Sequence, residues 1–512
     1  MNVPKSIFRE YDVRGLVDRE LTPEFARALG RAFASVAHDR LGHAPVIAVG
    51  RDNRPSSPAL SQGIRRGIAD AGGTAIDVGT LPTPALYFAV SALGTDGGLQ
   101  VTGSHNPPEF NGFKMVLAGE AFHGEEILGL WESIMAERWR SGVGKEGSDG
   151  SVLQRYRDAI ITRHKLERPV QVVVDCGNGA GSLIAVATLQ GLGAEVTPLF
   201  CESDGTFPNH HPDPTVPENL RDLQVAVRRG GAELGIAFDG DADRIGAVDE
   251  TGEIIFGDQL LVIFGRDAVR RFGRGTPVIF DVKSSDLLPA ALTAAGAKPV
   301  MWKTGHSLIK AKMKELNAPL AGEMSGHMFF GGDYLGFDDA LFAAARLLEI
   351  VSRQPFGLSP LLADLPKTFA TPEIRVECPE DEKFDLVERA AVHFTSKYPV
   401  NTIDGVRITF PKGWGLLRAS NTQAVLVMRF EATDPASRDA YQAEATRQPV
   451  RSRVNWSRCQ SVRNLAAPGE NWAAHQRSAR RVAVQRPTKR KAKSVPIVAV
   501  SRRPRRDIRL KA

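Results

Sequence analysis

Two short stretches of this sequence have residue types and spacings that could do chemistry, and the first is a serine turn. Ser104 and His105 lie in the run TGSHNPP, directly after an apolar stretch that ends at Val101. Glycine, asparagine and proline do not continue a strand, so we expect a sharp turn that holds the serine hydroxyl in the open beside the histidine. A serine hydroxyl is a weak nucleophile that needs activation, and Lys114 supplies a nearby cation. Taken alone, the run fits a polar surface turn equally well.

The second stretch is acidic. Asp239, Asp241 and Asp243 alternate after the apolar run LGIAF, and Arg244 follows them. Three carboxylates that point the same way repel one another unless a cation lies among them, and oxygen ligands without histidine or cysteine suit Mg²⁺. A solvated acidic turn is the alternative, but apolar residues flank the run, and no glutamate follows at EF-hand spacing. Arg244 is expected to orient the ligands, to bind phosphate or to form an ordinary salt bridge.

Two further loops have the groups that bind a sugar and a phosphate. Glu323 and Ser325, in the run GEMSGH, can pair with adjacent sugar hydroxyls through an acceptor and a hydroxyl. The run RASNT offers an arginine fork, two hydroxyls, an amide and backbone N–H groups, which together suit a phosphate dianion. Its polar members are Arg418, Ser420, Asn421 and Thr422. The serine turn and the acidic turn together predict phosphoryl chemistry.

The runs TGSHNPPEFNGFK, FDGDADR, GEMSGH and RASNT, in this order, resemble the α-D-phosphohexomutase superfamily, most closely its phosphomannomutase/phosphoglucomutase branch. The similarity extends from Ile7 to about Glu444. It implies that Ser104 is carried as a phosphoserine whose phosphate completes a Mg²⁺ site. The implied ligands are Ser104, Asp239, Asp241 and Asp243. It also implies interconversion of hexose 1-phosphates and hexose 6-phosphates, of mannose and/or glucose, through a 1,6-bisphosphate, with glucose 1,6-bisphosphate as activator.

Further residues are expected to line a central cleft. The predicted catalytic residues are Ser104, His105, Lys114, Arg244 and His306, and the resemblance assigns proton transfer to Lys114. The predicted substrate-binding residues are Tyr11, Arg14, Lys283, Glu323, Ser325, His327, Arg418, Ser420, Asn421 and Thr422. Met324 favours the hexose branch over the phosphoglucosamine branch. A phosphoglucosamine mutase, a phosphatase and a catalytically impaired sugar-phosphate-binding protein are the alternatives.

These loops need elements that hold them, and a strand, a polar loop and a helix recur three times. The three strands begin near Val46, Val172 and Val278, and each is a continuous apolar run. Such strands alternating with helices predict α/β domains whose sheets are covered on both faces. After residue 367 the strands alternate apolar and polar residues, which predicts an α+β domain. The second copy contains GNGAG, which is better interpreted as a tight turn than as a dinucleotide-binding motif.

The predicted fold is therefore three related α/β domains with mixed sheets and a C-terminal α+β domain around a central cleft. The α/β domains are expected at residues 1–150, with the serine turn, 151–252, with the acidic turn, and 253–366, with the sugar loop. The α+β domain, with the phosphate loop, is expected at 367–446 and a basic, disordered tail at 447–512. The glycine-rich stretch 141–150 is expected to be a linker.

The charge is distributed unevenly along the chain. The formal charge is +6, but residues 447–512 contain 19 Lys and Arg against 2 Asp and Glu, which is +17, so residues 1–446 have −11. The composition of the tail predicts disorder and resembles a shifted reading frame or a fused extension. It lacks aromatic residues interleaved for base stacking, so nucleic-acid binding is not expected. If the tail replaces the last helix of the fourth domain, the Arg418 loop would be misplaced and activity lowered.

The sequence also indicates a compartment. Four cysteines are scattered without a CxxC pair, which argues against a zinc site or a disulfide framework and fits a reducing cytosol. No apolar run is long enough to predict a membrane span, and the N-terminus lacks the apolar core of a signal peptide. We therefore expect a cytoplasmic protein without a membrane partner. The resemblance implies hexose phosphates as its partners, and we expect a monomer or dimer.

Overall fold

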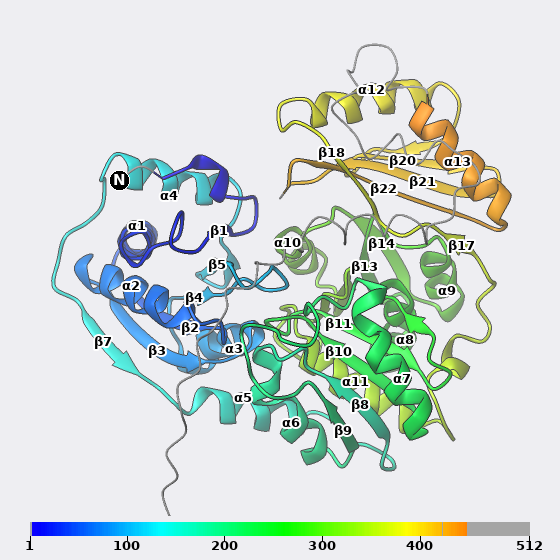
Figure 1. The fold of residues 1–512 in the computed structure, drawn as a ribbon, viewed down its shortest axis with the longest axis horizontal. Helices are drawn as coiled ribbons and strands as arrows, with labels where there is room; N and C mark the ends of the chain where they lie inside the picture. Colours follow the sequence, from blue (N-terminus) through cyan, green and yellow to red (C-terminus); the bar gives the residue numbers. More distant parts are fainter. Residues whose placement is uncertain (1–2, 422, 448–512) are drawn as a thin grey trace, which may run out of the picture. The chain divides into compact units, whose positions relative to one another are not determined.

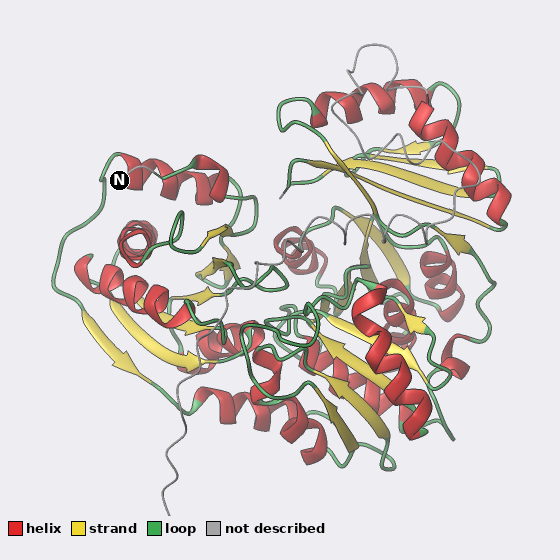
Figure 2. Ribbon diagram, in the orientation of Figure 1, coloured by secondary structure: helices red, strands yellow, loops and turns green. Residues whose placement is uncertain are grey.

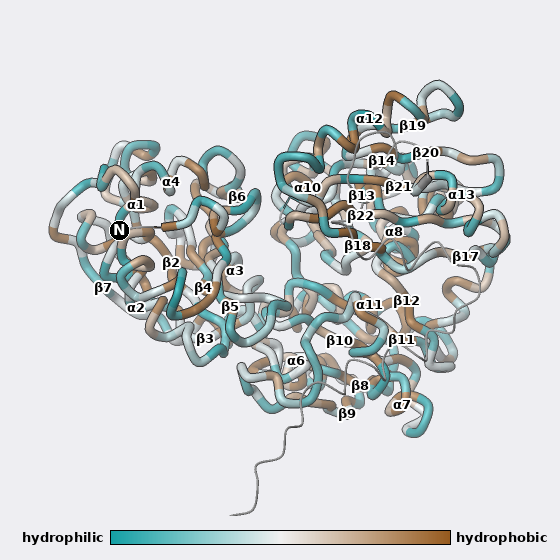
Figure 3. The backbone as a smooth tube through the Cα atoms, turned by 45° about the horizontal axis from the view of Figure 1, so that its top comes forward, coloured by the Kyte–Doolittle hydropathy of each residue, from teal (hydrophilic) through white to brown (hydrophobic). Residues whose placement is uncertain are grey.

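The computed structural model describes residues 3–421 and 423–447. Thr422 of the phosphate loop and the chain after 447 lie outside the described residues, so the expected disorder of the tail stays a prediction. The described chain forms four β-sheets with helices packed against them (Figures 1 and 2). Hydrophobic residues are concentrated in the strands, and hydrophilic ones in the connecting loops (Figure 3).

The first sheet has seven strands. In spatial order they are β1 (Val13–Leu16), β5 (Phe110–Leu117), β4 (Gly97–Val101), β2 (Val46–Arg51), β3 (Thr74–Thr80) and β7 (Lys145–Ser148), with β6 (Glu120–Ala121) beside β5. The accompanying helices are α1 (Pro23–Leu41), α2 (Ser57–Asp70), α3 (Thr83–Leu93) and α4 (Glu125–Met135).

Two smaller sheets follow. The strands of the second are, in order, β12 (Ile254–Ile255), β11 (Ile245–Asp249), β10 (Leu234–Phe238), β8 (Gln171–Asp175) and β9 (Glu195–Leu199), with helices α5 (Val152–Ile161), α6 (Ala185–Gly191) and α7 (Arg221–Gly230). Those of the third are β14 (Lys298–Trp302), β13 (Pro277–Asp281), β15 (Leu320–Gly322) and β16 (Met328–Phe330), with helices α8 (Gly257–Phe272), α9 (Leu287–Ala295), α10 (His306–Leu316) and α11 (Ala340–Val351).

These three sheets share one four-strand arrangement. In each, three parallel strands are followed by an antiparallel one, in the orders β3-β2-β4-β5, β9-β8-β10-β11 and β14-β13-β15-β16. The prediction of three related α/β domains is therefore confirmed. The serine turn, the acidic turn and the sugar loop all connect the third parallel strand to the antiparallel one. Because ligands bind outside the carboxyl ends of parallel strands, this topology places the three loops at equivalent positions.

Helices cover both faces of these sheets, and the central strands β2, β8 and β13 are accordingly buried along most of their length. In the first sheet, Ile47 and Val49 pack in one cluster with Phe25 of α1 and Ile64 of α2. Ala48, which points to the opposite face, packs in a second cluster with Leu86 of α3. That second cluster continues into the second and third sheets, so the three α/β domains share part of one hydrophobic core.

The helix α11 is the centre of this shared core, because every one of its residues is buried. Asp339 caps its N-terminus by accepting from the backbone N–H of Phe342 at 2.9 Å. The same carboxylate accepts from the hydroxyl of Tyr156, on α5, at 2.7 Å. A buried hydrogen bond of this kind holds the start of the second domain against the third.

The fourth sheet is antiparallel, as the alternating strands predicted. Its strands are β17 (Phe369–Ala370), β18 (Ile374–Glu377), β19 (Val400–Asn401), β20 (Val406–Phe410), β21 (Gly413–Ala419) and β22 (Val425–Ala432). Helices α12 (Lys383–Thr395) and α13 (Pro435–Arg447) lie on one face of it (Figure 2). Tyr441 of α13 stacks on Phe410 with ring centroids 4.2 Å apart. The last helix of this domain is thus present, and the concern that the tail replaces it is wrong.

Two short strands lie at the expected domain boundaries. The glycine-rich stretch expected to be a linker contains β7, which pairs in parallel with β3 as an edge strand. Its polar side chains are exposed, so its sequence resembles that of a loop. The strand β12, which lies beyond the predicted boundary at 252, pairs with β11 of the second sheet. No described helix is long and apolar enough to cross a membrane.

The buried His164 predicts a pH dependence of stability. Its ring packs against Phe342 of α11, and burial, with Arg346 close by, lowers its pKa from 6.5 to about 3. The unfolded chain therefore takes up a proton that the folded chain does not as the pH falls below 6.5, so stability falls. Between pH 7.5 and 5 this costs roughly 2 kcal/mol. Urea unfolding at both pH values should show that loss in the wild type and a correspondingly smaller loss in His164→Leu. Equal losses of unfolding free energy in the wild type and in His164→Leu would contradict this role of His164.

Candidate active site

The serine turn joins β4 to β5 and holds Ser104 in the left-handed region, with φ of 48°. Ser104 is 1% exposed, and its Oγ donates to Oδ2 of Asp239 at 2.8 Å and lies 3.2 Å from Nδ1 of His105. The expectation of a hydroxyl open to solvent is therefore wrong. The acidic turn covers it so closely that a Cβ on Gly240 would lie 2.3 Å from the carbonyl oxygen of Ser104.

A buried arginine that the sequence analysis did not single out holds this turn. Arg54 follows β2, and its guanidinium donates to four carbonyl oxygens of the turn. They belong to Ser104 (2.7 Å), Asn106 (2.6 Å), Pro107 (2.6 Å) and Phe110 (3.0 Å). Asp52 accepts from Nε of Arg54 at 3.1 Å and from the backbone N–H of Gly103 at 3.0 Å. A Cβ on Gly103 would lie 2.5 Å from this guanidinium, so the close approach requires glycine.

The acidic turn directs its carboxylates at one another and at Lys114. Asp239, Asp241 and Asp243 are buried, and one oxygen of each lies within 4.8 Å of the others. Lys114, on β5, donates to Oδ2 of Asp241 at 2.7 Å and also to Oδ2 of Asp243. Burial alone would lower the pKa of Lys114, but these two carboxylates outweigh it and hold the pKa well above its usual value. Lys114 is therefore held as an ammonium.

One lysine does not balance three buried carboxylates. Burial and the neighbouring Asp243 and Asp241 raise the pKa of Asp239 well above its usual value. Oδ1 of Asp241 and Oδ1 of Asp243 are buried and accept no hydrogen bond from the described residues. Oxygen donors in such a cluster are the ligands that hard divalent cations prefer. The residues present therefore fit a metal ion.

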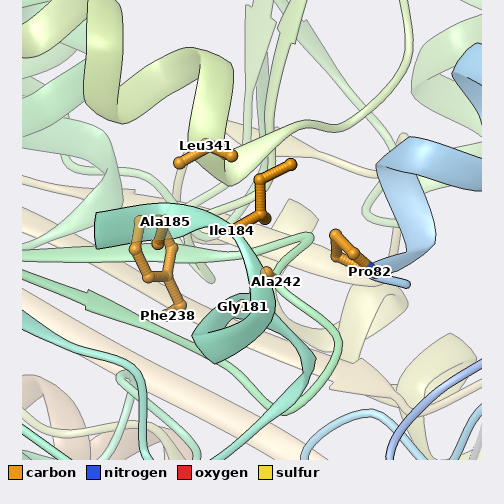
Figure 4. A pocket seen from close by; sticks show the side chains of 7 residues that line it. All are labelled: Pro82, Gly181, Ile184, Ala185, Phe238, Ala242 and Leu341. Atoms are coloured by element: carbon orange, nitrogen blue, oxygen red, sulfur yellow. The ribbon is translucent and has the colours of Figure 1, made fainter. Parts of the chain in front are cut away.

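Apolar residues back the acidic turn. The pocket behind it is lined by Pro82, Gly181, Ile184, Ala185, Phe238, Ala242 and Leu341 (Figure 4). Ala242 belongs to the turn itself and has a left-handed φ of 56°. The turn thus presents a methyl group to the apolar side and carboxylates to Ser104. Apolar backing lowers the local dielectric and so strengthens every charge interaction in the turn.

The sugar loop meets the acidic turn through an arginine, a histidine and a carboxylate. Nε of Arg244 donates to Nε2 of His327 at 3.0 Å. Because Arg244 donates to Nε2, the ring proton of His327 is on Nδ1, which lies 3.1 Å from Oδ2 of Asp338. Asp338, which the sequence analysis did not single out, therefore orients His327 and through it Arg244.

Two histidines at the site are held neutral. Burial, together with Arg244 and Arg14, lowers the pKa of His105 well below its usual value. Burial, together with Lys310, does the same to His306. A neutral imidazole beside a reacting hydroxyl can accept its proton.

The sugar loop and the aromatic residues near it form one connected group. Oε1 of Glu323 accepts from the backbone N–H of Gly305 at 2.6 Å, and Oε2 accepts from the hydroxyl of Ser325 at 3.1 Å. The ring of His306 packs edge-on against Tyr11, with centroids 5.5 Å apart. Tyr11, predicted to bind substrate, and His306, predicted to be catalytic, thus lie side by side although they belong to the first and third domains.

The phosphate loop joins this group from the fourth domain. Nδ2 of Asn421 donates to the hydroxyl of Tyr11 at 3.2 Å. The guanidinium of Arg418 pairs with Asp404, with Nη2 3.1 Å from Oδ2. Thr422, predicted to bind substrate, lies outside the described residues.

A buried lysine supports the phosphate loop from behind. Lys383, at the start of α12, is fully buried and donates to the carbonyl oxygens of Ser420 at 2.6 Å and Gln423 at 3.1 Å. These two bonds fix the backbone on either side of the loop tip, so Lys383 acts on this loop as Arg54 acts on the serine turn.

Two further predicted substrate ligands are basic side chains, one at the edge of the serine turn and one near the fourth domain. Nη1 of Arg14 donates to Oδ1 of Asn106 at 2.8 Å, at the edge of the serine turn. Nζ of Lys283 lies 3.3 Å from Oε2 of Glu373, at the entry to the fourth domain. Both side chains are basic groups that an incoming phosphate can draw into its own coordination.

Comparison with known proteins decides the family. Phosphoglucomutase/phosphomannomutase alpha/beta/alpha domains I, II and III match residues 5–140, 154–252 and 256–369. The C-terminal domain of the same family matches residues 373–448.

This chain belongs to the phosphoglucomutase/phosphomannomutase family.

Relatives in this family cover nearly the whole described chain. A phosphomannomutase/phosphoglucomutase of Pseudomonas aeruginosa is 49% identical over 433 residues, which are 84% of this chain and 92% of that protein. A phosphoglucomutase of Neisseria gonorrhoeae is 46% identical over 444 residues, 85% of this chain and 95% of that one. A crystal structure of a phosphoglucomutase/phosphomannomutase family protein from Burkholderia thailandensis is 41% identical, with a TM-score of 0.83 over 88% of this chain and 99% of that chain.

Membership in this family accounts for the buried cluster of carboxylates in the acidic turn. Phosphohexomutases are metal-dependent enzymes that act on sugar phosphates, and the acidic turn of this chain is a group of carboxylates that could hold the metal. The supporting residues are those that the sequence analysis missed: Asp52, Arg54, Asp338, Lys383 and Asp404. Their sequence signal was weak: Asp52 and Arg54 follow an apolar run, whereas Lys383 lies in the polar stretch PEDEK.

The contacts of Arg54 predict a loss of activity and of stability on substitution. Arg54→Lys keeps the charge but cannot reach four carbonyl oxygens, so kcat should fall by about 30-fold or more. The partly unpaired Asp52 should also lower the free energy of unfolding by about 3 kcal/mol. Steady-state kinetics and urea unfolding measure both. Arg51→Lys, whose half-buried guanidinium pairs with Asp77, is the matched control and should change kcat less than twofold. Equal effects of the two substitutions would contradict the role of Arg54.

The contacts of Lys383 predict weaker binding of substrate. Lys383→Met keeps the aliphatic stem but removes the donors to the phosphate loop, so the Kd for a hexose phosphate should rise by about tenfold. Calorimetric titration measures it. Lys412→Met, an exposed lysine of the same domain, is the control and should bind as the wild type does. An unchanged Kd in folded Lys383→Met would show that the loop holds its shape without this lysine.

Proposed function

We propose that this protein is a magnesium-dependent phosphohexomutase that interconverts hexose 1-phosphate and hexose 6-phosphate of mannose and/or glucose through phosphoserine 104 and a hexose 1,6-bisphosphate. The hydroxyl of Ser104, 2.8 Å from Asp239 in the carboxylate cluster, is the observation that supports this most directly. A phosphate on that hydroxyl would lie against the metal ligands. Membership in the family and relatives named phosphomannomutase/phosphoglucomutase support the same reaction.

The chain supplies positioning and charge, which are most of what phosphoryl transfer requires. Magnesium, held by Ser104, Asp239, Asp241 and Asp243, would neutralise charge on the phosphate. Lys114, held as an ammonium, stabilises negative charge and can give a proton but cannot take one. His105, which is neutral and lies 3.2 Å from Oγ of Ser104, is the group beside the nucleophile that can accept a proton.

The remaining loops orient the sugar. Glu323 and Ser325 are proposed to bind its hydroxyls, and Arg418 and its loop the phosphate that is not transferred. Arg418 must then leave Asp404, or share it, when a phosphate dianion arrives. After the first transfer the bisphosphate turns around, so the same loop must accept the phosphate at either end of the sugar. Glucose 1,6-bisphosphate would act as activator by phosphorylating Ser104.

The proposal also covers the compartment, the oligomeric state and the alternative functions of the site. The protein is proposed to work in the cytoplasm as a monomer or dimer, without a membrane or nucleic-acid partner. A phosphoglucosamine mutase, a phosphatase or a catalytically impaired binding protein remain as alternatives for the same site. Impairment was argued from the aberrant C-terminus, which lies after residue 447 and outside the described residues; the presence of α13 speaks against a missing last helix.

Phosphorus NMR with Ser104→Ala tests the proposed reaction. With Mg²⁺, a trace of glucose 1,6-bisphosphate and glucose 1-phosphate or mannose 1-phosphate, the wild type should form the 6-phosphate; glucosamine 1-phosphate is assayed in parallel. Ser104→Ala should lose activity by about 10³-fold or more, because the transferred phosphate has no acceptor. Ser141→Ala, an exposed serine outside the site, is the control. Release of inorganic phosphate, faster turnover of glucosamine 1-phosphate, or no conversion by folded protein would each overturn the proposal in favour of its alternative.

A further inference from the structure

A pair of cysteines lies behind the acidic turn, outside the residues given roles above. Cys176 follows β8 and Cys201 follows β9, and their sulfur atoms are 2.9 Å apart although the residues are 25 positions apart in sequence. The sequence analysis interpreted the cysteines as scattered. The parallel pairing of β8 with β9 brings these two together, because Asp175 lies opposite Leu199 at the ends of the strands.

The two thiols differ in environment. Cys176 is fully buried, whereas Cys201 is half-buried. Contact with the Cys176 thiol lowers the pKa of Cys201, and the same contact together with burial raises the pKa of Cys176. The thiolate is the reactive form of cysteine, so Cys201 is the sulfur that an oxidant reaches first and Cys176 is the one that follows.

We propose that Cys176 and Cys201 form a reversible disulfide in the presence of a peroxide. The thiolate of Cys201 attacks one peroxide oxygen, the O–O bond breaks, and a sulfenic acid and hydroxide form. The sulfur of Cys176 then attacks the sulfenic sulfur. The S–S bond forms, the S–O bond breaks, and the hydroxyl group leaves with the Cys176 proton as water. A dithiol reductant such as dithiothreitol reduces the disulfide back to two thiols. In a reducing compartment Cys176 and Cys201 are therefore both thiols at rest.

Backbone contacts connect this pair to Ser104. The backbone N–H of Ala180, in the turn after Cys176, donates to the carbonyl oxygen of Gly240 at 2.8 Å. A Cβ on Gly179 would lie 2.6 Å from that oxygen, so the two turns touch without side chains between them. Gly240 in turn packs on Ser104. The sulfurs must approach by about 0.9 Å to bond, and a shift of Cys176 is passed through these contacts to the nucleophile.

Peroxide treatment of the full-length protein tests the modification site. After oxidation, the remaining thiols are blocked with N-ethylmaleimide and the protein is digested for mass spectrometry. We expect a crosslinked peptide containing Cys176 and Cys201 that dithiothreitol separates. Cys201→Ser should not form it, and Cys378→Ser, which removes a buried cysteine of the fourth domain, should form it as the wild type does. Cys176→Ser should leave a sulfenic acid on Cys201 that dimedone labels. No crosslink in oxidised, folded wild type would overturn the proposal.

Activity tests the connection to the site, and this part rests on the proposed function. Oxidation should lower kcat about fivefold or more in the wild type and in Cys378→Ser, but not in Cys201→Ser, and dithiothreitol should restore it. A crosslink that leaves kcat unchanged would overturn the connection to Ser104. The mass measurement does not depend on mutase activity, so failure of the proposed function and failure of the disulfide are distinguishable.

Discussion

The close packing of the acidic turn on the serine turn is the constraint on which the rest of the site depends. Gly240 approaches the carbonyl of Ser104 more closely than any side chain would allow, and Gly103 does the same against Arg54. Ser104 and Ala242 both have left-handed backbone conformations that their surroundings must maintain. The four hydrogen bonds of Arg54 are that support for the serine turn. The nucleophile and the carboxylates are therefore brought into contact by backbone geometry, before any metal or substrate is involved.

Charge balance is the second constraint, because three buried carboxylates are costly unless they are compensated. Lys114 compensates two of them directly and is held as an ammonium as a result. The same enclosure keeps His105 and His306 neutral. The site thus separates its roles by environment: the lysine is a fixed positive charge, and the histidines are the groups that remain able to accept a proton.

Topology explains why loops from three separate domains can share this site. Each α/β domain presents its functional loop after its third parallel strand, and the shared core around α11 joins the three sheets. The fourth domain has a different fold and reaches the site through its phosphate loop, where Asn421 contacts Tyr11. Arg54 and Lys383 hold functional loops in place in the same way in two unrelated folds. Each is a buried cation that donates to backbone carbonyl oxygens behind a loop.

The sequence by itself determined the order of the four functional loops, the three repeated α/β units and the antiparallel fourth domain, because these follow from residue patterns within short stretches. It also identified Ser104, the three aspartates and Lys114 as chemically related. Only the tertiary structure showed that Ser104 is buried and that Arg54, Lys383 and Asp338 support the functional loops. It also showed that a polar, glycine-rich stretch is the edge strand β7, and that Cys176 meets Cys201. Each of these depends on contacts between residues far apart in the chain, which burial and strand pairing create and which no local pattern encodes.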